Sequence, residues 1–188
     1  HIATSGRPGP VLIDVPKDIG QGPCAAAFTD ALDLPGYTVP GRGDPERIAE
    51  AARYLREAKR PVLYVGHGAV ISDAGKAITA LAEKLRAPAV NTLLGKGAVD
   101  ETHPLNLGMF GMHGTAYANK AVVDCDLIMS IGGRWDDRIT GRLDAFSPNS
   151  TKVHIDIDRS SINKTVRVDL PIVADVGKAI RQMITIWN

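Results

Sequence analysis

A charged loop in the middle of the chain carries the residues best suited to bind a ligand. Arg134 and Arg138 bracket the neighbouring carboxylates Asp136 and Asp137. Guanidinium groups are permanently charged forks that suit a diphosphate, and each charge-assisted hydrogen bond contributes about 1.5 to 3 kcal/mol. An internal network of ion pairs is the alternative. Because adjacent carboxylates point apart and no third acid lies nearby in sequence, a metal site is not expected.

Paired glycines precede this loop, and a second glycine turn occurs earlier in the chain. Gly132 and Gly133 permit a tight turn that brings backbone N–H groups close to a ligand. Gly66 and Gly68 follow another apolar run, which is the context of a phosphate-facing turn or of a purely structural one. An ordinary nicotinamide-binding fingerprint is disfavoured, because Ile71 occupies the place of its third glycine.

Two further loops offer contacts to a hydroxylated or flat ligand. The Thr92 hydroxyl suits a ribityl or sugar hydroxyl, although a simple polar turn is equally consistent with the sequence. His113 has no serine or cysteine partner in the pattern. We therefore expect His113 to pack against or hydrogen bond a flat cofactor, with Phe110 and Met112 as apolar contacts.

Carboxylates occur near the ends of the last two predicted strands. Asp156 and Asp158 close an apolar strand, where a carboxylate typically binds ribose hydroxyls. Asp175 begins the last helix, where it binds a ligand or caps the helix. Glycines, arginines and acids thus follow the strands without a nucleophile and its base. This indicates a holder of an extended nucleotide with no catalytic residue of its own.

The elements that must position these side chains alternate between short apolar strands and amphipathic helices. The predicted strands are Pro61–Val65, residues 88–91, Leu127–Ile131, residues 152–157 and Leu170–Val173. The predicted helices cover residues 45–59, 72–86, 115–124 and 175–187, with a possible helical turn at 160–164. This alternation predicts an α/β, Rossmann-like, doubly wound parallel sheet of about six strands with helices on both faces.

The first part of the chain differs in character. Residues 10–15 resemble a strand between prolines, and a lone strand needs a sheet to complete it, so we expect a piece of a longer protein. Residues 21–43 are rich in proline and glycine and are predicted to be a linker. Residues 44–188 form the predicted nucleotide-binding domain.

Composition excludes several classes of protein. The chain has 188 residues, of which 44% are hydrophobic and 23% charged, with a formal net charge of +1. This predicts a globular domain without bulk attraction to nucleic acid or membranes, and no run suggests a membrane span or a signal segment. Cys24 and Cys125 are the two cysteines, which favours a reducing compartment over a zinc site.

Four motifs resemble the catalytic (large) subunit of acetolactate synthase, also called acetohydroxyacid synthase, in order and spacing. They are G-R-P-G-P-V-L-I-D-V-P-K-D, G-M-F-G-M-H-G-T-A-Y-A-N, G-G-R-W-D-D-R-I-T-G and H-I-D-I-D. The resemblance covers nearly the whole chain. It implies a central domain that binds FAD, whose redox chemistry the net reaction does not use. It also implies that residues 1–20 contain the C-terminal strand of a preceding pyrimidine-binding domain.

Carrying the family's FAD contacts over by position gives a set of expected cofactor-binding residues. They are Arg7, Gly66, Gly68, Thr92, Leu93, Met112, His113, Gly132, Arg134, Asp136, Arg138, Ile139, Asp156, Ile157, Asp175 and Val176. Lys17 resembles a lysine at the mouth of the family's substrate channel, where herbicides act. The chain departs from the family at His67, Gly133 and Trp135, where glycine, alanine and phenylalanine are usual. Of these, His67 could crowd a phosphate or donate to it.

The resemblance also implies what the parent protein does and with whom. The parent condenses pyruvate with pyruvate or 2-oxobutyrate, releasing CO2, in branched-chain amino-acid biosynthesis. Thiamine diphosphate and Mg²⁺ belong to flanking domains, so this chain alone is expected to be inactive. Expected partners are those domains, a homodimer or homotetramer and a regulatory small subunit, with no nucleic acid and no membrane. A cytoplasmic location is expected, or an organelle in a eukaryote.

Three alternatives remain open from the sequence. Another thiamine-diphosphate carboligase, similar to glyoxylate carboligase, shares the same domain. A sirtuin-like NAD-dependent deacylase is faintly suggested by G-H-G-A-V-I-S-D-A-G, but that class expects four zinc-binding cysteines. A nucleotide-free interaction module is the third, because an unpaired strand at residues 10–15 favours association.

Overall fold

The computed structural model describes residues 1–25 and 34–187. Contacts divide the chain into two units, His1–Val39 and Pro40–Asn188, and each is described by itself. The predicted linker, residues 21–43, crosses this boundary, and its residues 26–33 lie outside the described part.

The first unit contains a 3-10 helix, η1 (Ile2–Thr4), and a short helix, α1 (Lys17–Gly20). The strand expected at residues 10–15 is not formed. Its apolar side chains are exposed instead, Leu12 to 88% and Ile13 to 81%. The expectation fails because a strand needs the N–H and C=O groups of a neighbouring strand, and none pairs with these residues in the described chain.

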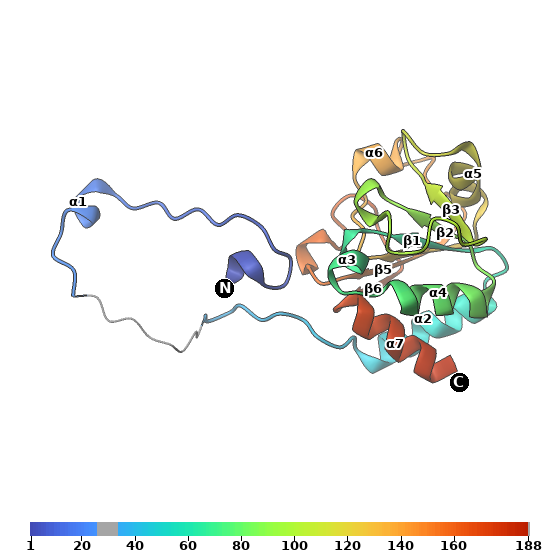
Figure 1. Ribbon diagram of the computed structural model, residues 1–188, viewed down its shortest axis with the longest axis horizontal. Coiled ribbons are helices and arrows are strands. Elements are labelled where there is room, and N and C mark those ends of the chain that lie inside the picture. Colours follow the sequence, from blue (N-terminus) through green and yellow to red (C-terminus); the bar gives the residue numbers. More distant parts are fainter. Residues whose placement is uncertain (26–33, 188) are drawn as a thin grey trace. The chain divides into compact units, whose positions relative to one another are not determined.

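The second unit is built on a six-stranded parallel sheet, which confirms the predicted fold class (Figure 1). The strand order is β3-β2-β1-β4-β5-β6. The strands are β1 (Pro61–Val65), β2 (Ala89–Asn91), β3 (Asn106–Met109), β4 (Leu127–Ile131), β5 (Thr151–Asp156) and β6 (Leu170–Val173). The order reverses between β1 and β4, so this pair forms the topological switch point where α/β sheets bind ligands.

Helices cover both faces of this sheet. They are α2 (Pro45–Glu57), α3 (His67–Ile71), α4 (Gly75–Leu85), α5 (Ala116–Asp124), α6 (Asp137–Thr140) and α7 (Val176–Trp187), with 3-10 turns η2 (Leu93–Gly95) and η3 (Arg159–Ser161). One core cluster joins α2, α4 and α7 to the sheet, and a second lies beneath α5 (Figure 1). Among the described residues, no helix has the length and apolar character needed to cross a membrane.

Local sequence explains how α2 begins and which face it buries. The Asp44 carboxylate accepts hydrogen bonds from the backbone N–H groups of Glu46 at 2.9 Å and Arg47 at 3.3 Å, and Pro45 occupies the first turn. Apolar side chains then recur at helical spacing, and Ile48 and Leu55 are buried against the sheet. The predicted start of this helix is confirmed.

The predicted helix at residues 72–86 is one helix in the structure, α4, which begins three residues later than expected and is preceded by the short helix α3. Ser72 ends α3 rather than beginning a helix, and its hydroxyl donates to the Gly68 carbonyl at 2.8 Å. Asp73 then takes a left-handed backbone conformation, with φ of 47°, and α4 begins at Gly75. A left-handed residue interrupts the helical hydrogen-bond pattern, which the apolar spacing alone does not reveal.

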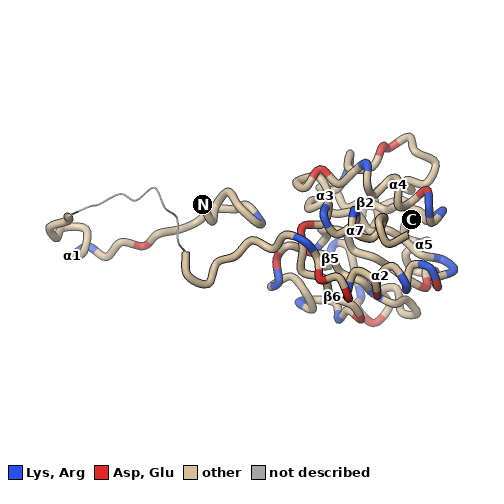
Figure 2. Tube along the Cα trace, turned by 90° about the horizontal axis from the view of Figure 1, so that it is seen from below, with Lys and Arg blue, Asp and Glu red and all other residues tan. Residues whose placement is uncertain are grey.

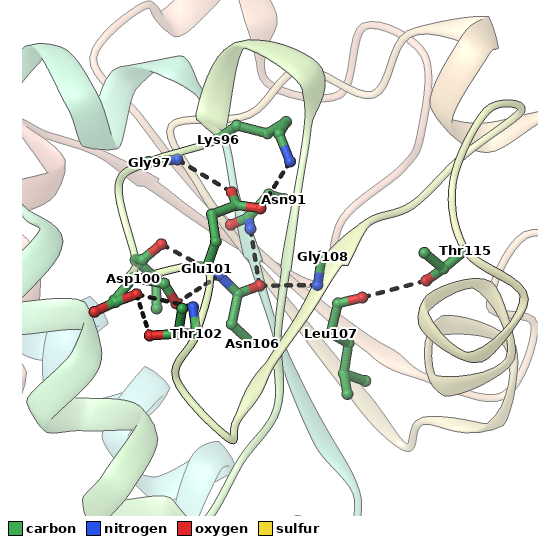
Figure 3. Close-up of polar contacts among 11 residues, drawn as sticks. Asn91, Lys96, Gly97, Asp100, Glu101, Thr102, Asn106, Leu107, Gly108 and Thr115 are labelled. Atoms are coloured by element: carbon green, nitrogen blue, oxygen red, sulfur yellow. Dashed lines mark hydrogen bonds and ion pairs between the residues drawn. The ribbon is translucent and has the colours of Figure 1, made fainter.

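Strand β3 was not among the strands located from the sequence. Figure 3 shows why it forms: the Asn106 carboxamide oxygen accepts from the Asn91 side-chain amide at 2.9 Å and from Gly108 N–H at 2.8 Å. Its amide group donates back to the Val99 and Asp100 carbonyls. These side-chain bonds reinforce the parallel pairing of this edge strand with β2. The strand was missed because Asn106 and Gly108, the latter with a φ of +78°, interrupt the apolar run that identifies a strand.

Candidate functional site at the carboxyl edge of the sheet

The loops after β1 and β4 pack directly against each other at the switch point. Gly66 N–H donates to the Ile131 carbonyl and Gly68 N–H to the Gly132 carbonyl, both at 3.0 Å. A Cβ added at Gly66 would lie 2.3 Å from the Gly132 oxygen and from the Gly133 Cα, which no side chain can do. These glycines are therefore required by backbone-to-backbone packing.

This packing changes the role expected of the glycines. Gly132 N–H donates to the Ile155 carbonyl at 2.9 Å, so it is not directed at a ligand. A Cβ at Gly133 would lie 2.7 Å from the ring of Tyr64. The structure thus supports the alternative of a structural turn for Gly66, Gly68 and Gly132, because the N–H group of each already donates to a backbone carbonyl. Because glycine has no side chain, these residues still allow a ligand to lie close to the backbone.

The backbone of Arg134 is held by a buried tyrosine, while its side chain remains half exposed. The Tyr64 hydroxyl donates to the Arg134 carbonyl, and Tyr64 is fully buried. Burial raises the pKa of Tyr64 well above its usual range, and the nearby Asp136 carboxylate adds to this rise. The Tyr64 hydroxyl therefore stays protonated and donating, while the guanidinium of Arg134 remains half exposed and lies 3.0 Å from the Asp136 carboxylate.

Arg138 lies in α6 and pairs with its neighbour. Its guanidinium is 2.9 Å from the Asp137 carboxylate, and both side chains are exposed. Its backbone carbonyl accepts from Met112 N–H at 2.8 Å, which joins the loop after β3 to α6. The charged loop therefore forms separate pairs on the surface. Exposed pairs are worth about 0 to 1 kcal/mol, so a ligand phosphate can replace the carboxylates at small cost.

The residues after β2 and β3 are partly as expected. Thr92 caps η2, and its hydroxyl oxygen accepts from Gly95 N–H at 2.9 Å, as the polar-turn alternative requires. Leu93 and Met112 expose 68% and 63% of their surface and offer apolar contact. Phe110 does not, because it is buried in the core with its ring centroid 4.8 Å from that of Tyr64. The expected cofactor contact of Phe110 is wrong.

Histidines and carboxylates occupy the remaining strand ends. His113 is exposed, and the Nδ1 of His67 lies 3.0 Å from the Leu94 carbonyl, so this ring is turned toward η2. Asp156 is nearly buried at the end of β5 and accepts from Asp158 N–H at 2.8 Å. Asp175 accepts from Lys178 N–H at 2.9 Å, which makes it the cap of α7.

Neighbouring strand ends are tied together by further backbone bonds. Thr92 N–H donates to the Val65 carbonyl and Ala174 N–H to the Asp156 carbonyl, both at 3.0 Å. The structure therefore brings the expected site residues of the second unit to one edge. They are Gly66, Gly68, Thr92, Leu93, Met112, His113, Gly132, Arg134, Asp136, Arg138, Ile139, Asp156, Ile157, Asp175 and Val176. Arg7 and Lys17 belong to the first unit.

A buried pair beneath this edge was not singled out from the sequence. The Trp135 indole N–H donates to Nδ1 of His154 at 3.1 Å, and both rings are buried. Nδ1 is thus the acceptor, which places the ring proton on Nε2. Nε2 has no hydrogen-bond partner among the described residues and lies 3.8 Å from the Asp156 carboxylate. The H-I-D-I-D motif contains the signal, but only the fold brings Trp135 to it.

We expect Trp135→Phe to lower the free energy of unfolding by about 1 to 2 kcal/mol, because it leaves a buried ring nitrogen without its donor. Urea unfolding measures the loss, and a double-mutant cycle with His154→Leu isolates the pair. Additive losses in the cycle would show that the two side chains do not interact.

The thiols are expected to differ sharply in reactivity. Cys24 is exposed, whereas Cys125 is buried at the end of α5 and its thiol donates to the Val122 carbonyl. Burial raises the pKa of Cys125, so little thiolate exists near neutral pH. Ellman's reagent should titrate one thiol in the native protein and two in denaturant. Equal rates for both thiols in the native protein would contradict this placement.

Comparison with known proteins decides the family. A family described as the central domain of thiamine pyrophosphate enzymes matches residues 48–183. The chain belongs to this family. No group of three or more metal-binding side chains occurs in the part of this central domain that the structure describes.

Curated relatives of this thiamine pyrophosphate enzyme domain carry consistent names. The acetolactate synthase large subunit of Parasynechococcus marenigrum (strain WH8102) is 46% identical over 191 residues, covering 98% of this chain and 30% of that protein. The probable acetolactate synthase large subunit of Methanocaldococcus jannaschii is 46% identical over 187 residues, covering 98% and 32%. The acetolactate synthase of Mycobacterium bovis is 44% identical over 184 residues, covering 98% and 30%. The resemblance read from the motifs is confirmed, and the chain spans about a third of these relatives.

Proposed function

We propose that this chain is the FAD-binding central domain of an acetolactate synthase. The observation that carries the proposal is the identity of 44 to 46% with proteins of that name over 98% of the chain. The parent protein would join two 2-oxo acids, pyruvate with pyruvate or 2-oxobutyrate, with loss of CO2. This domain would bind the cofactor and organise the subunit, with no catalytic residue of its own.

The carboxyl edge suits an extended, doubly charged nucleotide. Arg134 and Arg138 expose guanidinium groups that can bind a diphosphate, and their present partners are replaceable surface carboxylates. The packed glycines keep the switch point free of side chains, so a ligand can approach the backbone. Leu93 and Met112 offer an apolar surface for a flat ring. Bound FAD would supply a structural brace, since its redox chemistry is not used in the net reaction.

The chemistry of the parent would depend on groups outside this chain. Thiamine diphosphate and Mg²⁺ would be held by a pyrimidine-binding domain, to which residues 1–20 belong, and by a diphosphate-binding domain. Residues 21–43 would link the first of these to the present domain, with Lys17 near the substrate channel. The parent would form a homodimer or homotetramer, bind a regulatory small subunit and lie in the cytoplasm or, in a eukaryote, in an organelle.

An FAD titration of the purified protein tests the proposal, with NAD as the control. A ligand that binds only the folded state must raise its thermal stability, so FAD but not NAD should raise the melting temperature. Stabilisation by NAD alone would contradict the proposal and favour a deacylase. No acetolactate should form from the 188 residues alone, and turnover by them would contradict the assignment of catalysis to other domains.

A second carboligase class is separated by substrate. A protein similar to glyoxylate carboligase would bind FAD equally well, so the titration does not distinguish it. Product analysis of the parent with pyruvate and with glyoxylate does. We expect acetolactate from pyruvate, because the curated relatives described above carry the acetolactate synthase name.

A further inference from the structure

A cavity lies at the amino-terminal ends of β1 and β2, away from the candidate site at the carboxyl ends of the strands. Its volume is about 620 Å³, within the range of about 300 to 1,000 Å³ typical of small-molecule sites. It is bounded by the start of β1, the residue before β2 and the C-terminal ends of α2, α4, α5 and α7. Its apolar wall includes Leu55, Val62, Leu85 and Trp187.

The charged side chains of this cavity are mostly basic. Five cations line it, and Asp124 is the one carboxylate among its lining residues. Asp124 is itself paired with Lys120 at 2.8 Å. Figure 2 shows Lys and Arg positions at the end of the second unit where the C-terminus lies. The five lining cations are Arg56, Lys59, Arg60, Lys84 and Arg86.

Helix ends explain only part of this positive charge. Arg56 donates to the Ile186 carbonyl at 3.2 Å and lies over the Trp187 ring at 4.9 Å. It therefore stabilises the C-terminal end of α7 and holds the Trp187 ring in the cavity wall. Lys59 and Arg60 are different, because they lie beyond the end of α2. Their backbone N–H groups donate to the Asp126 carboxylate at 2.7 and 2.9 Å, and both residues line the cavity.

We propose that this cavity binds an amphipathic organic anion, an apolar body that carries a carboxylate or phosphate. The apolar wall would hold the body and remove it from water, while Lys59 and Arg60 would meet the anionic group at the rim. The cavity is separate from the proposed FAD site, because the strands run parallel and the two sites lie at opposite strand ends.

Tryptophan fluorescence offers a direct test, because the chain has two tryptophans and Trp187 is the one at the cavity. In a Trp135→Phe background, 4-phenylbutyrate should quench or shift Trp187 emission saturably at millimolar concentration. The neutral 4-phenylbutan-1-ol should bind at least tenfold more weakly, and acetate should give no response. Added salt should weaken the binding of 4-phenylbutyrate and leave the binding of the neutral alcohol unchanged.

Charge removal completes the test. The double substitution Lys59→Gln and Arg60→Gln keeps the backbone hydrogen bonds to Asp126. It should lower the affinity for 4-phenylbutyrate at least fivefold. Arg47→Gln, at the other end of α2, removes one charge outside the cavity and should leave binding unchanged. Equal binding of acid and alcohol, equal weakening by Arg47→Gln, or no saturable response would each overturn the proposal.

Discussion

Gly66→Ala should produce the largest loss of stability of any conservative change at the switch point. The new methyl group would lie 2.3 Å from two backbone atoms of the β4 loop, and backbone cannot rotate away as a side chain can. Overpacking typically costs 1 to 3 kcal/mol, so with no route of relief we expect at least about 3 kcal/mol, a large share of the 5 to 15 kcal/mol of a typical domain. Urea unfolding with a constant m-value measures it.

Gly97→Ala is the matched control for this change. Gly97 has a φ of +83°, but a Cβ there meets no atom within 4 Å. It therefore carries the backbone cost of about 1 to 2 kcal/mol without a collision. Similar losses at Gly66 and Gly97 would show that the loops after β1 and β4 do not pack as described.

If the chain binds FAD as proposed, Arg134→Ala should produce the largest loss of FAD affinity. Its guanidinium is half exposed in the loop that follows β4, and its backbone carbonyl accepts a hydrogen bond from Tyr64, so the side chain extends from a fixed backbone. Loss of one charge-assisted hydrogen bond, at about 1.5 to 3 kcal/mol, corresponds to a rise of about 10- to 150-fold in the dissociation constant. Quenching of flavin fluorescence measures it.

The matched control is Arg142→Ala. Arg142 is also exposed and pairs with an adjacent acid, Asp144, but it lies beyond the end of α6. FAD affinity should be unchanged by its loss. If both substitutions weaken FAD equally, the effect is general electrostatics and Arg134 is not a specific contact. If neither does, the diphosphate is held elsewhere.

Strands with continuous apolar runs could be located from the sequence alone. Pro61–Val65, Leu127–Ile131 and Leu170–Val173 are strands over the predicted residues, because buried parallel strands require apolar side chains on both faces. The edge strand Asn106–Met109 could not be located, because it lacks a continuous apolar run and forms by pairing with β2, from which the Asn91 amide also donates to the Asn106 side chain. The parallel order then places the carboxyl ends of all strands together, so the location of the candidate site follows from the fold class.

Individual roles within the site were harder to predict, because they depend on residues far apart in the chain. Gly66 is required by the carbonyl of Gly132, which no local pattern shows. Phe110 lies beside exposed Met112 in sequence yet is buried against Tyr64. Trp135 meets His154 only once β5 has paired with β4. Residue type and spacing thus indicated the chemistry available, and packing decided which atoms face a ligand.

The strand order also dictates the sequence of events during synthesis of the chain. β1 is central, yet its partner β4 is encoded far downstream, with Pro61 opposite Leu127. Closing so long a loop lowers the chain entropy before any stabilising contact between the two strands has formed, and such topologies fold slowly. While the ribosome is still making residues 66–126, the edge of β1 that later pairs with β4 has no partner strand. A nascent chain stalled in this interval should therefore bind chaperones, and release of β4 should end that binding.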